Sequence, residues 1–467
     1  MAKQKIFYQP DEGFVADIIP FYEDGEFKLF YLHDYRDREK HGEGTPWYLV
    51  TTKNFTSYKE LGEVIPRGSI DEQDLYIFTG SVFKKDDTYN IFYTGHNPHF
   101  DVEGKKVQAI MHAVSHDLVH WTKIKEDTFY SEGIDFELHD WRDPFVFEFK
   151  GEYKMAITAR TKNTHKTRSG VTILYKSDDL VKWTFDEVIW MPSAYYAHEC
   201  PDIFKINGKW YLIYSEFTDQ CLTRYVVSDS LHGPWKALKN DAFDGRAFYA
   251  AKSITNDKNE RFLFGWNPTK HEENDKNFWH WGGSLEVHKI DADKDGSLNV
   301  SLPTSIENMF KTELEYDKVI IQSKDKLKSF LVKDEVDESY MLTFKFKTDD
   351  AYQIGVMLRH SLKEDFAYAY FMDYAKDKLS FDNLPVEAWS FNNFRNVYRN
   401  YRFKTNHEHE VKIIVEKDIC ICYVDNKIAL SSRMYQKGGS GLSLFIKHGD
   451  VEFKNVQYKK LKKENEV

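Results

Sequence analysis

Three acidic side chains stand inside apolar runs in the first half of the sequence. They are Asp17 within residues 13–20, Asp143 within residues 140–147 and Glu199 within residues 197–204. An acid in an apolar strand is costly unless it is paired or functional. Cleavage of a glycosidic bond needs one carboxyl group to protonate the leaving oxygen and another to attack carbon or to activate water. The other explanation for any one of the three is a strand-end acid bound to backbone amides.

An internal repeat relates these acids to one another. A turn followed by an aromatic-rich strand recurs five times, and its first aromatic residue is Phe27, Tyr89, Tyr153, Trp210 and Phe262 in turn. Asp17 and Asp143 each precede the aromatic of their copy by 10 residues, and Glu199 precedes its own by 11. We therefore expect the three acids at equivalent positions in the first, third and fourth units, which favours a shared site over three unrelated structural acids.

The same repeat predicts the fold. A second segment, a polar turn that ends in an aromatic residue, follows the first four copies at residues 52–58, 115–121, 177–183 and 228–235. Each unit then holds four short strands, as one propeller blade does. An all-β chain is predicted, with a five-bladed β-propeller over residues 1–295. A large β-sandwich with accidental similarity is the alternative, and five copies in order argue against it. Inner strands of a propeller meet at one central funnel, where distant acids can converge.

The pattern changes after the fifth unit. Residues 296–318 are predicted to be a linker and residues 319–467 a β-sandwich, because alternating strands follow one another there. Residues 418–427 are typical of a hairpin with an Asp425-Asn426 turn. The sandwich could brace the propeller, bind sugar or form a homodimer, and bracing is the simplest of these roles.

Composition narrows the partners. Aromatic residues make up 16% of the 467 residues, which favours β-structure and suits the stacking of sugar faces on rings. The net charge is −11 without a basic stripe, which argues against nucleic acid as a partner. The four cysteines form no pattern with histidine that suits a metal, so we expect reduced thiols, no metal, no cofactor and a cytoplasmic protein. The N-terminus lacks the long apolar stretch of a signal peptide, and no run is long and apolar enough to span a bilayer.

Short motifs in the first 250 residues resemble the β-fructofuranosidase family of glycoside hydrolases, which includes invertases, levanases and inulinases. The matching segments are Arg142-Asp143-Pro144, Glu199-Cys200-Pro201, Phe78-Thr79-Gly80-Ser81 and Phe248-Tyr249-Ala250. The resemblance implies that Asp17 is the nucleophile, Glu199 the acid/base and Asp143 the stabiliser of the transition state. It also implies retaining hydrolysis or transfer of β-fructofuranosyl units without a metal.

The sequence departs from that family around Asp17. Ala16 and Ile18 flank this residue where the family usually has Asn-Asp-Pro-Asn-Gly, so the nucleophile motif is divergent. The substrate, an oligosaccharide or a small fructoside, therefore stays open among sucrose, inulin, levan and other furanosides. Arg142 is expected to keep its neighbour Asp143 ionised. The residues predicted to bind substrate are Arg142, Trp47, Phe78, Ser81, Tyr249 and Trp281.

Two other functions fit the same residues. A related five-bladed enzyme could act on arabinosides or xylosides with inversion, using the first Asp as the base for water. A carbohydrate-binding protein without catalysis is the third reading. The separation of the carboxyl groups distinguishes the enzymes, since retention needs about 5–5.5 Å and inversion about 6.5–9.5 Å.

Overall fold

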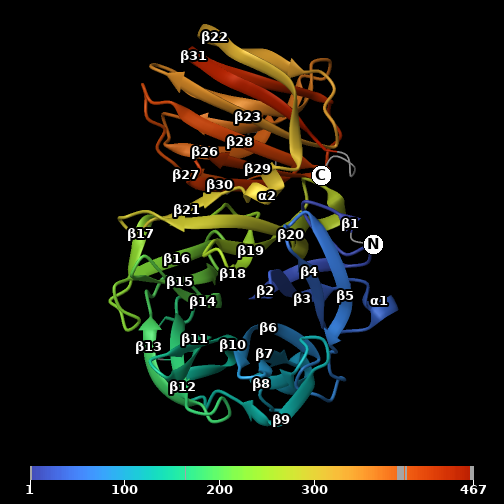
Figure 1. The fold of residues 1–467 in the computed structure, drawn as a ribbon, viewed down its shortest axis with the longest axis vertical. Helices are drawn as coiled ribbons and strands as arrows, with labels where there is room; N and C mark the ends of the chain where they lie inside the picture. The colour runs from blue at the N-terminus through green and yellow to red at the C-terminus, as the bar shows by residue number, and fades with distance from the viewer. Residues whose placement is uncertain (1–2, 163–164, 387–393, 395–396, 463–467) are drawn as a thin grey trace.

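The structure is a computed structural model, and it describes residues 3–162, 165–386, 394 and 397–462. Nearly all of its regular elements are strands. They form a ring of small sheets and a second body that packs on one side of the ring (Figure 1). The predicted architecture, a five-bladed β-propeller followed by a β-sandwich, is confirmed. Within the described residues no helix is both long and apolar enough to cross a membrane.

Each blade is built from four antiparallel strands that follow one another in the sequence. The first blade holds β2 (Phe14–Glu23), β3 (Glu26–Asp34), β4 (Trp47–Thr52) and β5 (Ser57–Ile65), with β1 (Lys3–Gln4) on its outer edge. The second holds β6 (Tyr76–Lys85), β7 (Thr88–His96), β8 (Gln108–Ser115) and β9 (Thr122–Phe129). The third holds β10 (Phe136–Phe149), β11 (Glu152–Thr161), β12 (Gly170–Ser177) and β13 (Thr184–Trp190). The fourth holds β14 (His198–Ile206), β15 (Lys209–Glu216), β16 (Thr223–Ser228) and β17 (Lys236–Ala242). The fifth holds β18 (Tyr249–Thr255), β19 (Arg261–Lys270), β20 (Trp279–Ala292) and β21 (Leu298–Ser301).

The first strand of each blade lies at the centre of the ring. These inner strands are β2, β6, β10, β14 and β18, and their labels surround the middle of the propeller in Figure 1. The ring closes where β2 meets β20, at the pair Val15 and Gly283. Short helices occupy the loops: α1 (Arg38–His41), η1 (Pro98–Asp101) and η2 (His271–Glu273).

A shift of the pairing register interrupts every inner strand at the corresponding place. It falls between Ala16 and Ile18, Phe78 and Gly80, Arg142 and Phe145, Glu199 and Asp202, and Tyr249 and Lys252. Bulges of this kind redirect side chains and are common beside active sites. In three blades the residue that begins the bulge has a positive φ, namely Asp143 at 60°, Cys200 at 53° and Ala250 at 53°. Such a backbone costs on the order of 1–3 kcal/mol in a residue other than glycine.

The bulges correct one prediction. Asp17 and Asp143 both lie within their bulges, but Glu199 is the last paired residue before its own bulge, opposite Ser215. The position of Glu199 is therefore equivalent to that of Arg142, and Cys200 is equivalent to Asp143. The expectation that all three acids are equivalent was wrong by one residue for Glu199.

The second repeated segment has a chemical explanation. In the second blade the Ser115 hydroxyl accepts the amide of Leu118 at 3.0 Å, and Asp117 accepts the amides of Val119 and His120 at 2.9 and 2.8 Å. Ser177 and Asp179 make the same bonds in the third blade. Serine and aspartate recur because each satisfies amides of a tight turn whose own backbone cannot.

The second body is built on one long hairpin. Its strands are β22 (Phe310–Lys333), β23 (Ser339–Thr348), β24 (Gln353–Ser361), β25 (Phe366–Asp373), β26 (Lys378–Leu384), β27 (Tyr398–Asn400), β28 (His409–Glu416), β29 (Ile419–Val424), β30 (Ile428–Arg433) and β31 (Gly441–Leu461). β22 and β31 pair along almost their whole length, and β31 pairs with β24 before Gly449 and with β23 after it. The hairpin thus contributes to both faces of the sandwich, whose core lies between them.

Strands occupy much of the segment predicted to be a linker. β21 pairs with β20 and completes the fifth blade, and β22 already begins at Phe310. α2 (Thr304–Glu307) lies between them.

Buried polar contacts join the sandwich to the fifth blade. Arg433 on β30 is almost fully buried and donates to the carbonyls of Pro268 and Asn267 at 2.9 and 3.0 Å. It also donates to Ser284 Oγ at 2.9 Å and pairs with Asp418 at 2.6 Å. One guanidinium therefore ties β19 and β20 to the sandwich.

We expect Arg433→Met to lower the stability of the whole chain by roughly 3–5 kcal/mol, since it leaves buried acceptors without donors. The measurement is the midpoint of thermal unfolding followed by circular dichroism. Arg402→Met, at an exposed position on the same body, is the matched control and should change the midpoint little. Equal midpoints for the two variants would contradict this account of the interface.

Candidate active site

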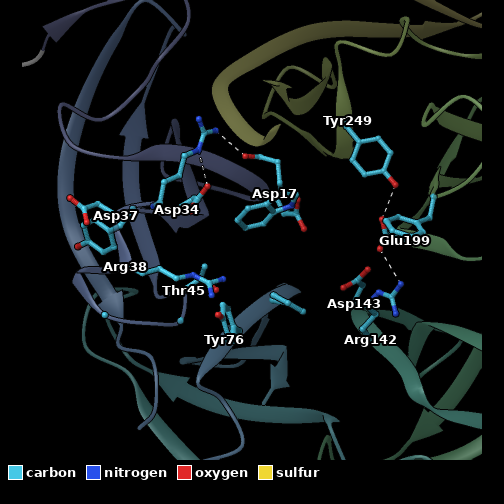
Figure 2. A pocket seen from close by; sticks show the side chains of 17 residues that line it. Asp17, Asp34, Asp37, Arg38, Thr45, Tyr76, Arg142, Asp143, Glu199 and Tyr249 are labelled. Atoms are coloured by element: carbon cyan, nitrogen blue, oxygen red, sulfur yellow. Dashed lines mark hydrogen bonds and ion pairs between the residues drawn. The ribbon is translucent and has the colours of Figure 1, made fainter. Parts of the chain in front are cut away.

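A cavity of about 380 Å³ opens at the centre of the propeller and holds the three predicted acids (Figure 2). Its lining comes from all five blades. The lining residues are Asp17, Asp34, Tyr35, Arg36, Asp37, Arg38, Gly42, Gly44, Thr45, Tyr76, Phe78, Arg142, Asp143, Glu199, Phe217, Tyr249 and Trp281. In Figure 2, Asp143 and Glu199 lie on one side of the cavity, and Asp34, Asp37 and Arg38 lie on the opposite side. Asp37 and Arg38 are exposed to solvent.

Asp17 receives its hydrogen bonds from other blades. The Trp266 indole nitrogen on β19 donates to Asp17 Oδ1 at 2.8 Å, and the Thr79 hydroxyl on β6 donates to Oδ2. The Cys200 thiol lies 3.8 Å from the same oxygen. Burial raises the pKa of the Asp17 carboxyl, and the bonds from Thr79 and Trp266 oppose this rise. These donors stabilise the ionised form of a group that its surroundings would otherwise keep neutral.

Asp143 is held at the start of its bulge. Its amide donates to Thr94 Oγ1 at 2.7 Å, and its Oδ2 accepts the Cys200 amide at 2.9 Å. Burial raises the pKa of the Asp143 carboxyl to about 7, although the positive charge of Arg142 lowers it. The charge of Arg142 lowers the pKa of Asp143, as predicted, but burial outweighs that charge, and the guanidinium forms its hydrogen bonds with Asp140 and Glu199.

Glu199 is the partner of that guanidinium. Arg142 donates to Glu199 Oε1 at 3.0 Å and to Asp140 at 2.7 Å, and the Tyr249 hydroxyl donates to Glu199 Oε2 at 2.7 Å. Burial and the charge of Glu199 raise the pKa of Tyr249 well above its usual value, so the phenol stays protonated. Both Glu199 oxygens are therefore bound, one by a fixed cation and one by a neutral hydroxyl.

The structure brings together some of the predicted binding residues and not others. Arg142, Phe78, Tyr249 and Trp281 line the cavity with the three acids.

Trp47 and Ser81 are not part of that lining. Trp47 is fully buried on β4 and donates its indole N–H to the Phe78 carbonyl at 3.2 Å. Ser81 is buried on β6, and its hydroxyl accepts the Val146 amide at 2.9 Å. Both join neighbouring strands, and Thr79 is the β6 hydroxyl that reaches an acid.

The sequence reasoning missed several residues that line the cavity. Arg36 has a positive φ of 58°, pairs with Asp34 at 3.2 Å and donates to the Trp281 carbonyl at 2.9 Å. Asp37 accepts the amide of Lys40 at 3.0 Å and so begins helix α1, which carries Arg38 to the cavity. These residues stand in the loop between β3 and β4, outside the two repeated segments, so the repeat carried no signal for them. Trp266 could have been found, because it ends the fifth copy of the repeated strand.

Two carboxyl groups that face one cavity are the groups that glycoside hydrolases use to cleave a glycosidic bond. The model for the N-terminal domain of glycosyl hydrolases family 32 matches residues 7–298, and the model for the family 32 C-terminal domain matches residues 306–460. The chain belongs to glycoside hydrolase family 32.

Several curated relatives are similar to it at low identity. A sucrose-6-phosphate hydrolase of Bacillus subtilis is 29% identical over 47% of this chain and 48% of that enzyme. The chain thus spans about half the length of that relative. A sucrose-6-phosphate hydrolase of Escherichia coli is 22% identical over 91% of the chain and 87% of the enzyme. A levanbiose-producing levanase of B. subtilis is 23% identical over 97% and 89%.

Solved structures agree on the fold. A sucrose-6-phosphate hydrolase of Lactobacillus gasseri has a TM-score of 0.77 at 18% identity, covering 98% of this chain and 93% of that one. An exo-inulinase of Aspergillus awamori has a TM-score of 0.76 at 16% identity, covering 98% of both chains.

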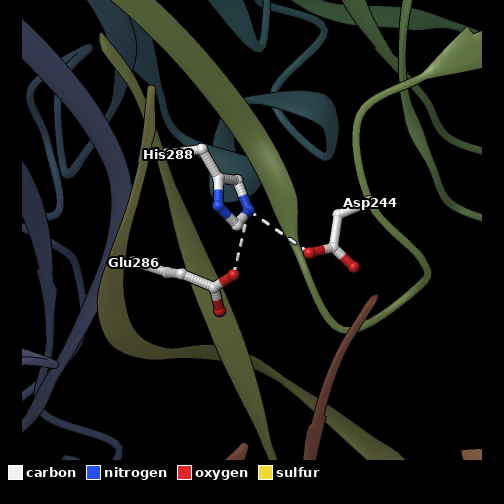
Figure 3. Close-up of side chains that lie close together, drawn as sticks. All are labelled: Asp244, Glu286 and His288. Atoms are coloured by element: carbon white, nitrogen blue, oxygen red, sulfur yellow. Dashed lines mark ion pairs between the residues drawn. The ribbon is translucent and has the colours of Figure 1, made fainter. Parts of the chain in front are cut away.

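A second acidic cluster lies outside the cavity, between the propeller and the sandwich (Figure 3). His288 Nε2 lies 3.2 Å from Asp244 Oδ2 and 3.1 Å from Glu286 Oε1, and all three side chains are inaccessible to solvent. These atom types could ligate a metal. However, the Ser431 hydroxyl of the sandwich already lies between the two carboxylates, 2.6 Å from Asp244 Oδ2.

The other atoms of the cluster have protein partners as well. Asp244 Oδ1 accepts the Ser431 amide at 2.8 Å, and Glu286 Oε2 accepts from Asn267 at 3.0 Å. His288 Nδ1 lies 2.9 Å from the Tyr423 hydroxyl. The cluster therefore suits a buried polar network that fastens two domains better than a metal centre.

We expect this network to make the stability of the chain depend on pH. Burial alone would lower the pKa of His288, but Asp244 and Glu286 outweigh it and raise the pKa to about 9 from 6.5. Protonated His288 thus stabilises the fold fully below pH 6.5, and this contribution is lost as the pH rises towards 9.

The midpoint of thermal unfolding should therefore fall between pH 6.5 and pH 9 in the parent protein and fall less in His288→Gln. Exposed His165 supplies the matched variant, His165→Gln, which should keep the parent's pH dependence. If His288→Gln retained that dependence in full, the assignment of the pH effect to this network would be wrong.

Proposed function

We propose that this protein hydrolyses β-fructofuranosyl linkages with retention of configuration, with Asp17 as nucleophile and Glu199 as acid/base. One observation carries the proposal: two carboxyl groups of one cavity have opposite kinds of partner. The side-chain donors to Asp17 are neutral, namely Thr79, Trp266 and the more distant Cys200 thiol, and Asp17 lines the cavity where a substrate would bind. Glu199 accepts hydrogen bonds from Arg142 and from Tyr249. The Tyr249 hydroxyl can donate to a carboxylate or accept from a carboxylic acid.

In the first step an Asp17 oxygen attacks the anomeric carbon of the fructosyl unit. Glu199 transfers its proton to the glycosidic oxygen as the bond to that oxygen breaks, and the leaving alcohol departs. In its ionised form, the Asp143 carboxylate would bind sugar hydroxyls and stabilise the positive charge that develops on the ring. The product of this step is an ester between Asp17 and the sugar.

In the second step Glu199, now ionised, takes a proton from water. The resulting hydroxide attacks the anomeric carbon, the ester bond breaks, and Asp17 is regenerated as a carboxylate. Two inversions at the same carbon give net retention. Transfer to another sugar follows the same path with an alcohol in place of water.

The cavity suits a small substrate. Its volume of about 380 Å³ is near the lower end of ligand sites, and Arg36, Arg38 and the exposed ring of Phe217 line it. We infer that these three residues contact the leaving group. We infer that the substrate is a short fructoside such as sucrose, a phosphorylated sucrose or a short fructan. The match of both family 32 models disfavours the arabinoside and xyloside alternatives.

The cellular setting belongs to the same proposal. The cysteines Cys200, Cys221, Cys420 and Cys422 are free thiols, which suits work in the reducing cytoplasm. A homodimer formed through the sandwich stays a prediction.

A substrate panel tests the proposed reaction. We expect release of fructose from at least one of sucrose, sucrose 6-phosphate, inulin oligosaccharides and levan oligosaccharides, with β-fructofuranose as the first anomer seen by NMR. Asp17→Ala should abolish turnover and leave the unfolding midpoint almost unchanged. Turnover of aryl arabinofuranosides or xylosides alone would contradict the substrate class, and a first product of inverted configuration would contradict the mechanism.

The acid/base assignment has its own test. Glu199→Gln should reduce kcat on sucrose-type substrates by about 10²–10⁴-fold, because their leaving groups need a proton. Fructosyl fluoride needs no such proton, so the loss of its first step should be much smaller. Pre-steady-state kinetics on both substrates measure the difference, and an equal loss on both would exclude Glu199 as the acid.

A further inference from the structure

Asp17 receives no side-chain hydrogen bond from its immediate neighbours. Ala16 and Ile18 are buried aliphatic side chains, which offer no side-chain donor. The side-chain donors to its carboxylate stand on other blades: Thr79 on β6, Trp266 on β19 and, at 3.8 Å, the Cys200 thiol on β14. The residue that sets its orientation must therefore be sought across the ring.

Trp266 meets that requirement by geometry. Its side chain is buried behind the cavity and is not among the residues that line it, yet its indole N–H lies 2.8 Å from Asp17 Oδ1. Its ring packs edge-on against Tyr249, with centroids 5.6 Å apart, and against Trp281, with centroids 6.4 Å apart. A ring packed on two sides keeps its N–H direction fixed.

Trp266 and Tyr249 are also direct cross-strand partners. They face one another in the pairing of β18 with β19, immediately before the bulge of that blade. Trp266 donates to Asp17, and Tyr249 donates to Glu199. The fifth blade contributes none of the three acids, but its Trp266–Tyr249 pair donates hydrogen bonds to two of them.

We propose that the cross-strand pair Trp266–Tyr249 is the positioning element that fixes the carboxyl groups of Asp17 and Glu199 relative to each other. The proposal rests on the function proposed above. An indole N–H is only a donor, so Trp266 favours the ionised form that a nucleophile needs. A phenol both donates and accepts, so Tyr249 can follow Glu199 through both of its states.

The first experiment compares pH profiles of kcat/KM. Trp266→Phe keeps an aromatic ring and removes the donor, so the acid limb, which reports ionisation of the nucleophile, should move up by about one pH unit. We expect kcat to fall about tenfold and KM to change little, because Trp266 does not line the cavity. Tyr249→Phe should instead lower kcat and leave the acid limb in place, because Tyr249 bonds to Glu199 and not to Asp17.

Trp235→Phe is the matched control. Trp235 is also buried, but its indole nitrogen has no hydrogen-bond partner among the described residues, so this variant loses the same ring atoms and no bond. Its acid limb should coincide with that of the parent. If Trp266→Phe and Trp235→Phe gave the same profile, Trp266 would be a packing residue only and the proposal would be overturned.

A second experiment needs neither turnover nor a folded Trp266 variant. In protein labelled with ¹⁵N at the tryptophan indoles, one indole N–H resonance should shift as Asp17 ionises, and Asp17→Asn should abolish that shift. No titrating indole, or one indifferent to Asp17→Asn, would overturn the proposal. A titrating indole in a protein that turns over no fructoside would instead refute the proposed function and leave the positioning intact.

Discussion

The site depends on the repulsion between three carboxyl groups that lie in one cavity, where the Arg142 guanidinium binds one of them. Arg142 supplies one positive charge against Asp17, Asp143 and Glu199, and it binds Glu199 directly. The pKa of Asp17 and the pKa of Asp143 are therefore both raised, mainly by burial and further by the neighbouring acids. Three buried acids stay close together only where the scaffold holds their strands in place and supplies hydrogen-bond donors to the carboxylates. The propeller meets both requirements.

The bulges meet the first requirement. A regular inner strand would alternate its side chains between the two faces of the blade. The register shift at the same height in every inner strand breaks that alternation and turns Asp17 and Asp143 towards the axis. Thr79 and Cys200 occupy the corresponding places in the second and fourth blades, and both lie beside Asp17. One local distortion, repeated five times, thus builds both the reacting groups and part of their support.

The sequence predicts the features of this fold and site that depend on residues near one another in the chain, and misses those that depend on contacts between blades. The blades and the Asp425-Asn426 turn were accessible, because they depend on residues close together in the chain; both turn residues have a positive φ of 54° and 50°. The convergence of the acids followed from propeller geometry once the repeat was found. The one-residue offset of Glu199 did not, because a bulge changes register without leaving a mark in the spacing. Trp47 and Ser81 were placed in the site by motif, yet a motif does not say which face a side chain takes. Thr79 and Trp266 were missed because they reach Asp17 from other blades.

The sandwich, finally, acts close to the chemistry although it lines no part of the cavity. Glu286 and His288 on β20 are hydrogen-bonded to Ser431 and Tyr423 of the sandwich. Arg433 donates hydrogen bonds to both β19 and β20. Trp266 on β19 pairs with Leu285, the residue directly before Glu286. The strand that carries the donor to Asp17 is therefore fixed on its outer side by the second domain. Bracing, the simplest of the roles considered for the sandwich, has a specific target in this arrangement: the sandwich bonds to β19 and β20 of the fifth blade, and β19 carries the Trp266 donor to Asp17.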